Sequence, residues 1–204
     1  MNKSILTKLG NKIELIDGKG KTLIIGVFHG DEPQGKYLID EYLKTNSEEG
    51  LLFIPCLNPD GLQLGKRTNA NGVDLNRNFP TKNWELTEKN EFFGGMRAGS
   101  EIETQFLTDT ISEFKPELIL TLHAPYKVVN YDGPAKEISE KISQIINYPV
   151  EASIGYPTPG SFGTYAGIER QIPTITLELD EVCPVQDLAK PVFQIFDMLK
   201  KRGL

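Results

Sequence analysis

Residues 22–35 read Thr-Leu-Ile-Ile-Gly-Val-Phe-His-Gly-Asp-Glu-Pro-Gln-Gly. The first half is an apolar, partly β-branched run bounded by glycines, which predicts a buried strand over 21–28. The second half places His29 and Glu32 three residues apart in a glycine-flanked turn. Because such a turn can aim an imidazole nitrogen and a carboxylate oxygen at one point, this stretch predicts a strand that ends in part of a metal site.

Strands and helices are expected to alternate along the rest of the chain. The hydrophobic periodicity predicts strands over 50–57, 117–123 and 174–179, and helices over 33–44, 100–114, 134–147 and 184–200. Ser100 and Glu103 match a capping box, and Pro191 favours a kink in the last helix. Residues 58–61 predict a turn, and the polar, glycine-rich stretch 62–99 predicts an ordered functional loop region.

This alternation predicts an α/β fold, with a mixed, mostly parallel sheet flanked by helices on both faces. The length of 204 residues suits a single domain over 1–204. In such a sheet the ligand site lies beyond the carboxyl ends of the strands, where His29, Asn58, His123 and Glu178 are expected to meet.

Composition narrows the class of partner. The formal net charge of −6 argues against a nucleic-acid or anionic-membrane surface. No segment reaches the ~20 apolar residues of a membrane span, and the first residues do not resemble a signal peptide, so a cytoplasmic protein is expected. Cys56 and Cys183 are expected to be reduced and to pack as small apolar residues.

The chain has only two histidines, His29 and His123. An isolated histidine is usually a hydrogen-bonded structural residue. Here both are expected at strand ends, and one has a glutamate three residues on, which favours a metal site made by His29, Glu32 and His123. One Zn²⁺ ion is the best match, since catalytic zinc commonly takes two histidines and a carboxylate and keeps one open position.

The block from Arg67 to Pro80 carries two arginines and several asparagines. Most such loops are solvated surface. Hydrolysis at a metal, however, needs a cation beside the developing oxyanion, and a substrate that ends in a carboxylate needs a guanidinium, so Arg67 and Arg77 are candidates for these two roles. Asp74 is a candidate to accept the second ring N–H of a metal-bound histidine.

Glu178 lies in the predicted strand 174–179, where Thr174 and Thr176 alternate with apolar residues. One interpretation is a polar, solvent-facing side of the strand. The alternative is a general base for the attacking water, with its pKa tuned by a partly apolar setting.

Taken together, these motifs resemble the zinc carboxypeptidase family, and the segment 154–165 resembles its bacterial murein peptide amidase branch. The motifs are His-Gly-Asp-Glu at 29–32, Asn-Pro-Asp-Gly at 58–61, the 67–80 block, Leu-His at 122–123 and Thr-Leu-Glu-Leu at 176–179. Singly they are weak, but in this order they span most of the chain.

The resemblance implies a role for each matching residue. His29, Glu32 and His123 would bind zinc, Arg67 would stabilise the oxyanion, and Glu178 would activate water and protonate the leaving amine. Asp74 would hold the first zinc histidine, while Asn76 and Arg77 would hold the substrate's terminal carboxylate.

The implied substrate is a small peptide with a free C-terminal carboxylate, cleaved at the bond between γ-D-glutamate and meso-diaminopimelate during cell-wall recycling. The interval before Glu178 is shorter than in digestive carboxypeptidases, and Tyr165 is the candidate for their mobile tyrosine. Asp132 is the candidate for binding the extra ammonium of diaminopimelate. We also expect the Ala124–Pro125 peptide bond to be cis, because the chain must turn sharply after His123.

Two other functions fit some of these residues. A zinc deacylase of the aspartoacylase and succinylglutamate desuccinylase type shares the His-x-x-Glu pair and the Asp-Leu-Asn-Arg stretch. A non-catalytic peptide-binding module would keep the fold and lose the general base. The sequence does not determine the oligomeric state.

Overall fold

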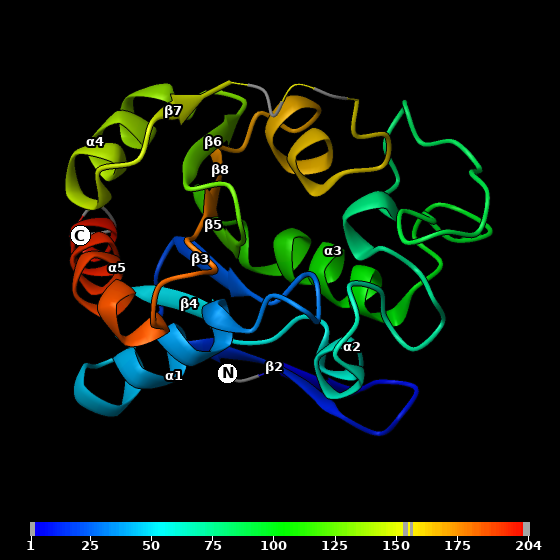
Figure 1. Ribbon diagram of the computed structural model, residues 1–204, viewed down its shortest axis with the longest axis horizontal. Coiled ribbons are helices and arrows are strands. Elements are labelled where there is room, and N and C mark those ends of the chain that lie inside the picture. The colour runs from blue at the N-terminus through cyan, green and yellow to red at the C-terminus, as the bar shows by residue number, and fades with distance from the viewer. Residues whose placement is uncertain (1–2, 153–154, 156, 202–204) are drawn as a thin grey trace.

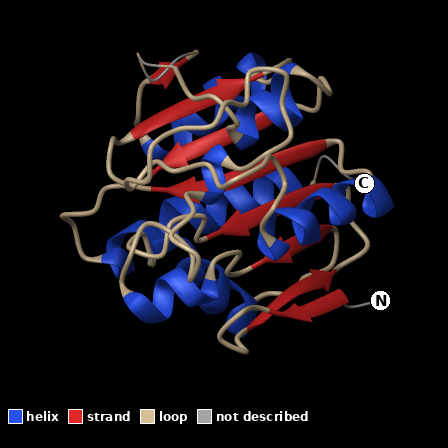
Figure 2. Ribbon diagram, turned by 90° about the vertical axis from the view of Figure 1, so that its right-hand side faces the viewer, coloured by secondary structure: helices blue, strands red, loops and turns tan. Residues whose placement is uncertain are grey.

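The computed structural model describes residues 3–152, 155 and 157–201, so parts of the segment 154–165 lie outside the described residues. One eight-stranded sheet passes through the molecule between helices (Figures 1 and 2), in the order β1-β2-β4-β3-β5-β8-β6-β7. Its strands are β1 Lys3–Leu6, β2 Lys12–Asp17, β3 Thr22–Gly26, β4 Leu51–Ile54, β5 Leu118–His123, β6 Val128–Asp132, β7 Val150–Glu151 and β8 Thr174–Glu178.

The helical elements cover both faces of this sheet. They are α1 Gln34–Thr45, α2 Pro59–Leu64, the short 3-10 helix η1 Leu75–Arg77, α3 Ile102–Phe114, α4 Lys136–Ile146, the π-helical turn η2 Gly163–Ile168 and α5 Val185–Lys200. Figure 1 shows α1, α4 and α5 on one side of the sheet and α3 on the other.

The centre of the sheet is parallel, as the alternation predicts. β4, β3, β5 and β8 pair in parallel, and their register places His123 beside Glu178 on neighbouring strands. The mixed α/β fold is therefore confirmed. The sequence interpretation missed the outer strands β1, β2, β6 and β7, of which β2 and β6 join the centre in antiparallel pairing.

Each face of the sheet has its own apolar core. On one face, Tyr42 of α1 packs edge-on against Phe196 of α5, with ring centroids 5.2 Å apart. On the other face, Phe106 of α3 joins Phe79 and Phe162 from the connecting segments. Burial of these aromatic side chains contributes much of the free energy that packs the helices onto both faces of the sheet, because each side chain removes a large apolar area from water.

Most predicted elements occur within a few residues of their expected bounds, and four local predictions have clear outcomes. The Ala124–Pro125 bond is cis, as expected. The capping box is wrong, because Glu101 is the N-cap of α3 and makes no side-chain capping bond, while Glu103 accepts a hydrogen bond from Asn69. α5 runs continuously through Pro191, and both free cysteines are unpaired.

Candidate active site

The turn that follows β3 is held in place by a second loop. Val27 has φ +54°, a left-handed conformation that costs energy for a β-branched residue and persists only where neighbours enforce it. Asn58 supplies part of that enforcement: its side-chain amide donates to the carbonyls of Phe28 and Arg67 at 3.1 and 3.3 Å. A Cβ at Gly30 would lie only 1.9 Å from the Gly61 carbonyl carbon, so the two loops meet at a position that requires glycine.

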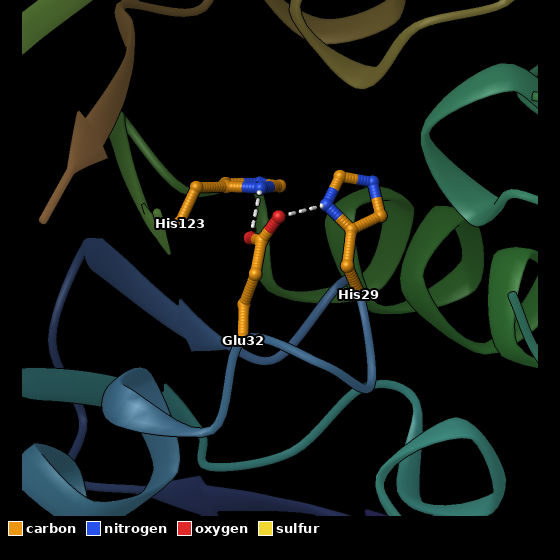
Figure 3. A group of neighbouring side chains, drawn as sticks. All are labelled: His29, Glu32 and His123. Carbon is orange, nitrogen blue, oxygen red and sulfur yellow. Dashed lines mark hydrogen bonds and ion pairs between the residues drawn. The ribbon is translucent and has the colours of Figure 1, made fainter. Parts of the chain in front are cut away.

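This turn and the end of β5 bring three side chains to one point (Figure 3). His29 Nδ1 lies 2.8 Å from one oxygen of Glu32, and His123 Nδ1 lies 3.1 Å from the other. One donor atom from each residue lies within 4.8 Å of the other two. The predicted convergence of His29, Glu32 and His123 is thus present.

Asp74 lies behind His29 and links it to Arg67. His29 Nε2 lies 3.2 Å from Asp74 Oδ1, and Arg67 Nε donates to Asp74 Oδ2 at 3.0 Å. Asp74 is fully buried, and it also accepts the backbone N–H of Asn76. One carboxylate therefore orients both the imidazole and the guanidinium.

The charges explain the protonation of this cluster. Burial alone would lower the pKa of His29, but the carboxylates Asp74 and Glu32 outweigh it and raise this pKa to about 9. Burial raises the pKa of Glu32, and the nearby imidazoles His29 and His123 lower it more, so the carboxylate stays ionised. A metal cation bound here in place of the proton on His29 would be stabilised by the same two carboxylates, Asp74 and Glu32.

The donor set fits zinc. Two nearly buried imidazoles and one carboxylate converge, and the ring nitrogen of His29 that faces away is already held by Asp74, the outer support that metal-binding histidines usually have. The carboxylate of Glu178 ends beside this point, and its Oε2 is buried without a hydrogen-bond partner among the described residues. That oxygen is therefore free to accept a proton from a water or substrate.

Glu178 is not on a solvent-facing strand surface. It is 7% exposed, Thr174 is fully buried and Thr176 is half-buried, so the polar side of β8 is largely covered. Burial raises the pKa of Glu178, with His123 acting in the opposite direction. A carboxylate with a raised pKa is better matched to proton transfer near neutral pH.

A cleft of about 640 Å³ connects these groups. Besides the three convergent residues and Glu178, its walls include Arg67, Asn76 and Arg77. Asn76 is fixed because its Oδ1 accepts the backbone N–H of Phe162 at 2.9 Å, and Arg77 donates to the Asn76 carbonyl at 2.8 Å. The structure thus brings together every predicted site residue except Tyr165 and Asp132, with Asp74 directly behind the cleft.

Tyr165 does not lie on the described cleft wall. Its ring is 6% exposed, packs 5.4 Å from the ring of Phe79 and is covered by the Arg170 guanidinium at 3.4 Å. A mobile lid needs a side chain that is free to swing, and in this geometry Tyr165 is packed against its neighbours.

Asp132 also lies away from the described cleft wall. β6 runs antiparallel to β8, so Val128 pairs with Glu178 while Asp132 pairs with Thr174, at the opposite end of that strand. Its carboxylate lies against Gly163 and its Cβ against Gly167, and burial raises the pKa of this carboxylate to about 6. The geometry thus places Asp132 away from the cleft, and the ammonium-binding role assigned to it stays a prediction.

One contributor to the site, Phe92, was missed in the sequence. Phe92 lies in the long loop, with its ring 5.2 Å from the Arg67 guanidinium and 6.0 Å from that of Arg77. Asn58 was placed near a strand end, but its bonds to two other loops could not be foreseen, because they join carbonyls distant in sequence. Only the Asn-Pro-Asp-Gly motif itself signalled that this turn was special.

Comparison with known proteins agrees with this geometry. The model of the zinc carboxypeptidase family matches residues 7–161. The chain belongs to the zinc carboxypeptidase family. Murein peptide amidase A of Escherichia coli K12 is 34% identical over 192 residues, which cover 87% of this chain and 78% of that protein.

Solved structures show the same fold. The murein-tripeptide amidase of E. coli O157 superposes with a TM-score of 0.88 at 30% identity, covering 98% of this chain and 91% of that one. Carboxypeptidase A of Helicoverpa armigera superposes with a TM-score of 0.75 at 18% identity, covering 100% of this chain and 68% of that one, a likeness of fold. The chain is therefore a hydrolase of this zinc-dependent family, which removes the non-catalytic binding module as an interpretation. Within the described residues, none of the helices has the length and apolarity to cross a membrane.

Proposed function

We propose that this hydrolase cleaves the amide bond between γ-D-glutamate and meso-diaminopimelate in free murein tripeptide, with one bound zinc ion. The observation that carries the proposal is the convergence of His29, Glu32 and His123 beside Glu178. Its support is the similarity over most of the chain to murein peptide amidase A. Action on free tripeptide in the cytoplasm, as part of cell-wall recycling, belongs to the same proposal.

Zinc held by His29, Glu32 and His123 would supply a Lewis acid that polarises the scissile carbonyl and acidifies water. Glu178 then takes a proton from the attacking water and passes it to the leaving amine. The unpartnered Oε2 of Glu178 is the atom that holds this proton in transit.

Arg67 and Arg77 have separate roles. Arg67 is anchored by Asp74 close to the donor atoms, with its NH1 3.8 Å from Glu32, so it donates to the oxygen on which negative charge develops. Arg77 and Asn76 line the same cleft, and Arg77 also lines a neighbouring recess that Arg67 does not, so these two residues hold the terminal carboxylate of the leaving amino acid. This spacing sets the substrate's direction across the site.

Purified protein incubated with zinc and L-Ala-γ-D-Glu-meso-diaminopimelate should release diaminopimelate, detected by mass spectrometry. A chelator should stop the reaction and added zinc should restore it. Acetyl- and succinyl-amino acids serve as the comparison, because a deacylase would hydrolyse these instead. Hydrolysis of the acylated amino acids with no release of diaminopimelate would overturn the proposal.

A further inference from the structure

A recess of about 480 Å³ opens from the cleft past Arg67. It shares Asp31, Arg67 and Glu91 with the cleft, whereas Arg77 is not part of its walls. Arg77 instead joins the cleft to a smaller recess of about 260 Å³, which meets the first recess at Asn90. The larger recess therefore extends the cleft from Arg67, and the smaller recess extends it from Arg77.

The direction of the substrate decides which part enters the recess beside Arg67. If the proposed function holds, the leaving amino acid places its carboxylate on Arg77 and the scissile carbonyl lies near Arg67. The acyl part of the substrate must then leave the centre past Arg67. The recess described above is the space it enters.

Two lysines give this recess its character. Lys66 and Lys89 line it, both are exposed, and neither forms an ion pair with a described residue. The Lys89 ammonium lies 5.8 Å from the ring centre of Phe93, a buried residue of the same wall, which favours a position at the recess. Asp31 and Glu91 line the same walls, so the recess presents both signs of charge and suits a zwitterion better than a purely anionic group.

The chemistry of a γ-glutamyl amide matches these charges. When glutamate is linked through its side chain, its α-carboxylate stays free on the acyl side of the scissile bond, and the alanine attached to its nitrogen adds an ammonium nearby. We propose that Lys66 and Lys89 bind this free α-carboxylate and so select γ-glutamyl substrates. This inference rests on the proposed function and specifies how the acyl half of the substrate is recognised.

The test compares two substrates that differ only in this charge. One is L-Ala-γ-D-Glu-meso-diaminopimelate, and the other carries an α-carboxamide on the glutamate, which is neutral and nearly the same shape. We expect wild-type kcat/KM to be about tenfold higher for the carboxylate, as two exposed ion pairs allow, and this ratio should shrink as salt is added. In the Lys66→Met/Lys89→Met double variant the ratio should fall to about one.

The Lys190→Met/Lys201→Met double variant is the matched control, because it removes the same two charges from exposed sites on α5 and its C-cap without touching the recess. It should keep the wild-type ratio, and circular dichroism verifies that all variants are folded. A double variant that keeps the wild-type ratio, or a wild type that cleaves both substrates equally, refutes the lysine subsite and leaves the proposed function standing. A wild type that cleaves neither substrate refutes the proposed function, and the subsite with it.

Discussion

Asp74→Asn should weaken zinc binding although Asp74 does not face the proposed zinc position. Its two oxygens are shared between His29 on one side and Arg67 on the other. An asparagine has one acceptor oxygen and one NH₂ group, so one of these partners would face a donor in place of an acceptor. The buried negative charge that favours a cation at the centre would also be lost.

The magnitude follows from this arrangement. Removing the outer hydrogen-bond partner of a metal-binding histidine typically costs about 10- to 100-fold in metal affinity. This corresponds to about 1.4–2.7 kcal/mol. We expect Asp74→Asn to lie at the upper end, because the same side chain also anchors Arg67 Nε at 3.0 Å and is fully buried.

The zinc dissociation constant can be measured by competition with a chromophoric chelator, with circular dichroism as the test of folding. Asp60→Asn is the matched control: Asp60 is equally buried and accepts hydrogen bonds from Leu9 N–H at 3.1 Å and Asn11 at 2.8 Å, but has no contact with His29. It should lower stability and leave zinc affinity unchanged. A folded Asp74→Asn protein with wild-type zinc affinity would refute the assigned role.

Three other outcomes are expected. Glu178→Gln should lower kcat for tripeptide hydrolysis by about 10²- to 10⁴-fold and retain zinc, as measured by mass spectrometry and metal analysis; near-normal turnover would exclude it as the base. Burial raises the pKa of Glu103 from 4.5 to about 7, so the free energy of unfolding should fall as pH rises from 4.5 to 7, by up to about 3 kcal/mol, and Glu103→Gln should flatten that fall in urea titrations. Parallel pH profiles for the two proteins would contradict this. Tyr165→Phe should leave kcat/KM unchanged, because the ring packs in the core against Phe79, whereas a large loss would restore Tyr165 as a functional residue.

The sequence determined the parts of this protein that depend on short spacings. The apolar run before His29 is a central strand because its residues are buried on both faces, and the His-x-x-Glu spacing aims two donors from a single turn. Helix periodicity likewise placed α1, α3, α4 and α5 close to their observed bounds. The presence of only two histidines identified His123 before any geometry was known.

Only the tertiary structure decided the rest. The outer strands β1, β2, β6 and β7 are short and only partly buried, so their sequences carry only a weak hydrophobic pattern. Which strand each of them pairs with depends on which edge of the central sheet is open to it. Whether a carboxylate or a tyrosine reaches the cleft depends on strand direction and on what packs over it, as Asp132 and Tyr165 show. The spacing along the chain determines which side chains project from the same turn. The distance between separate turns is determined instead by packing among residues that are far apart in the sequence.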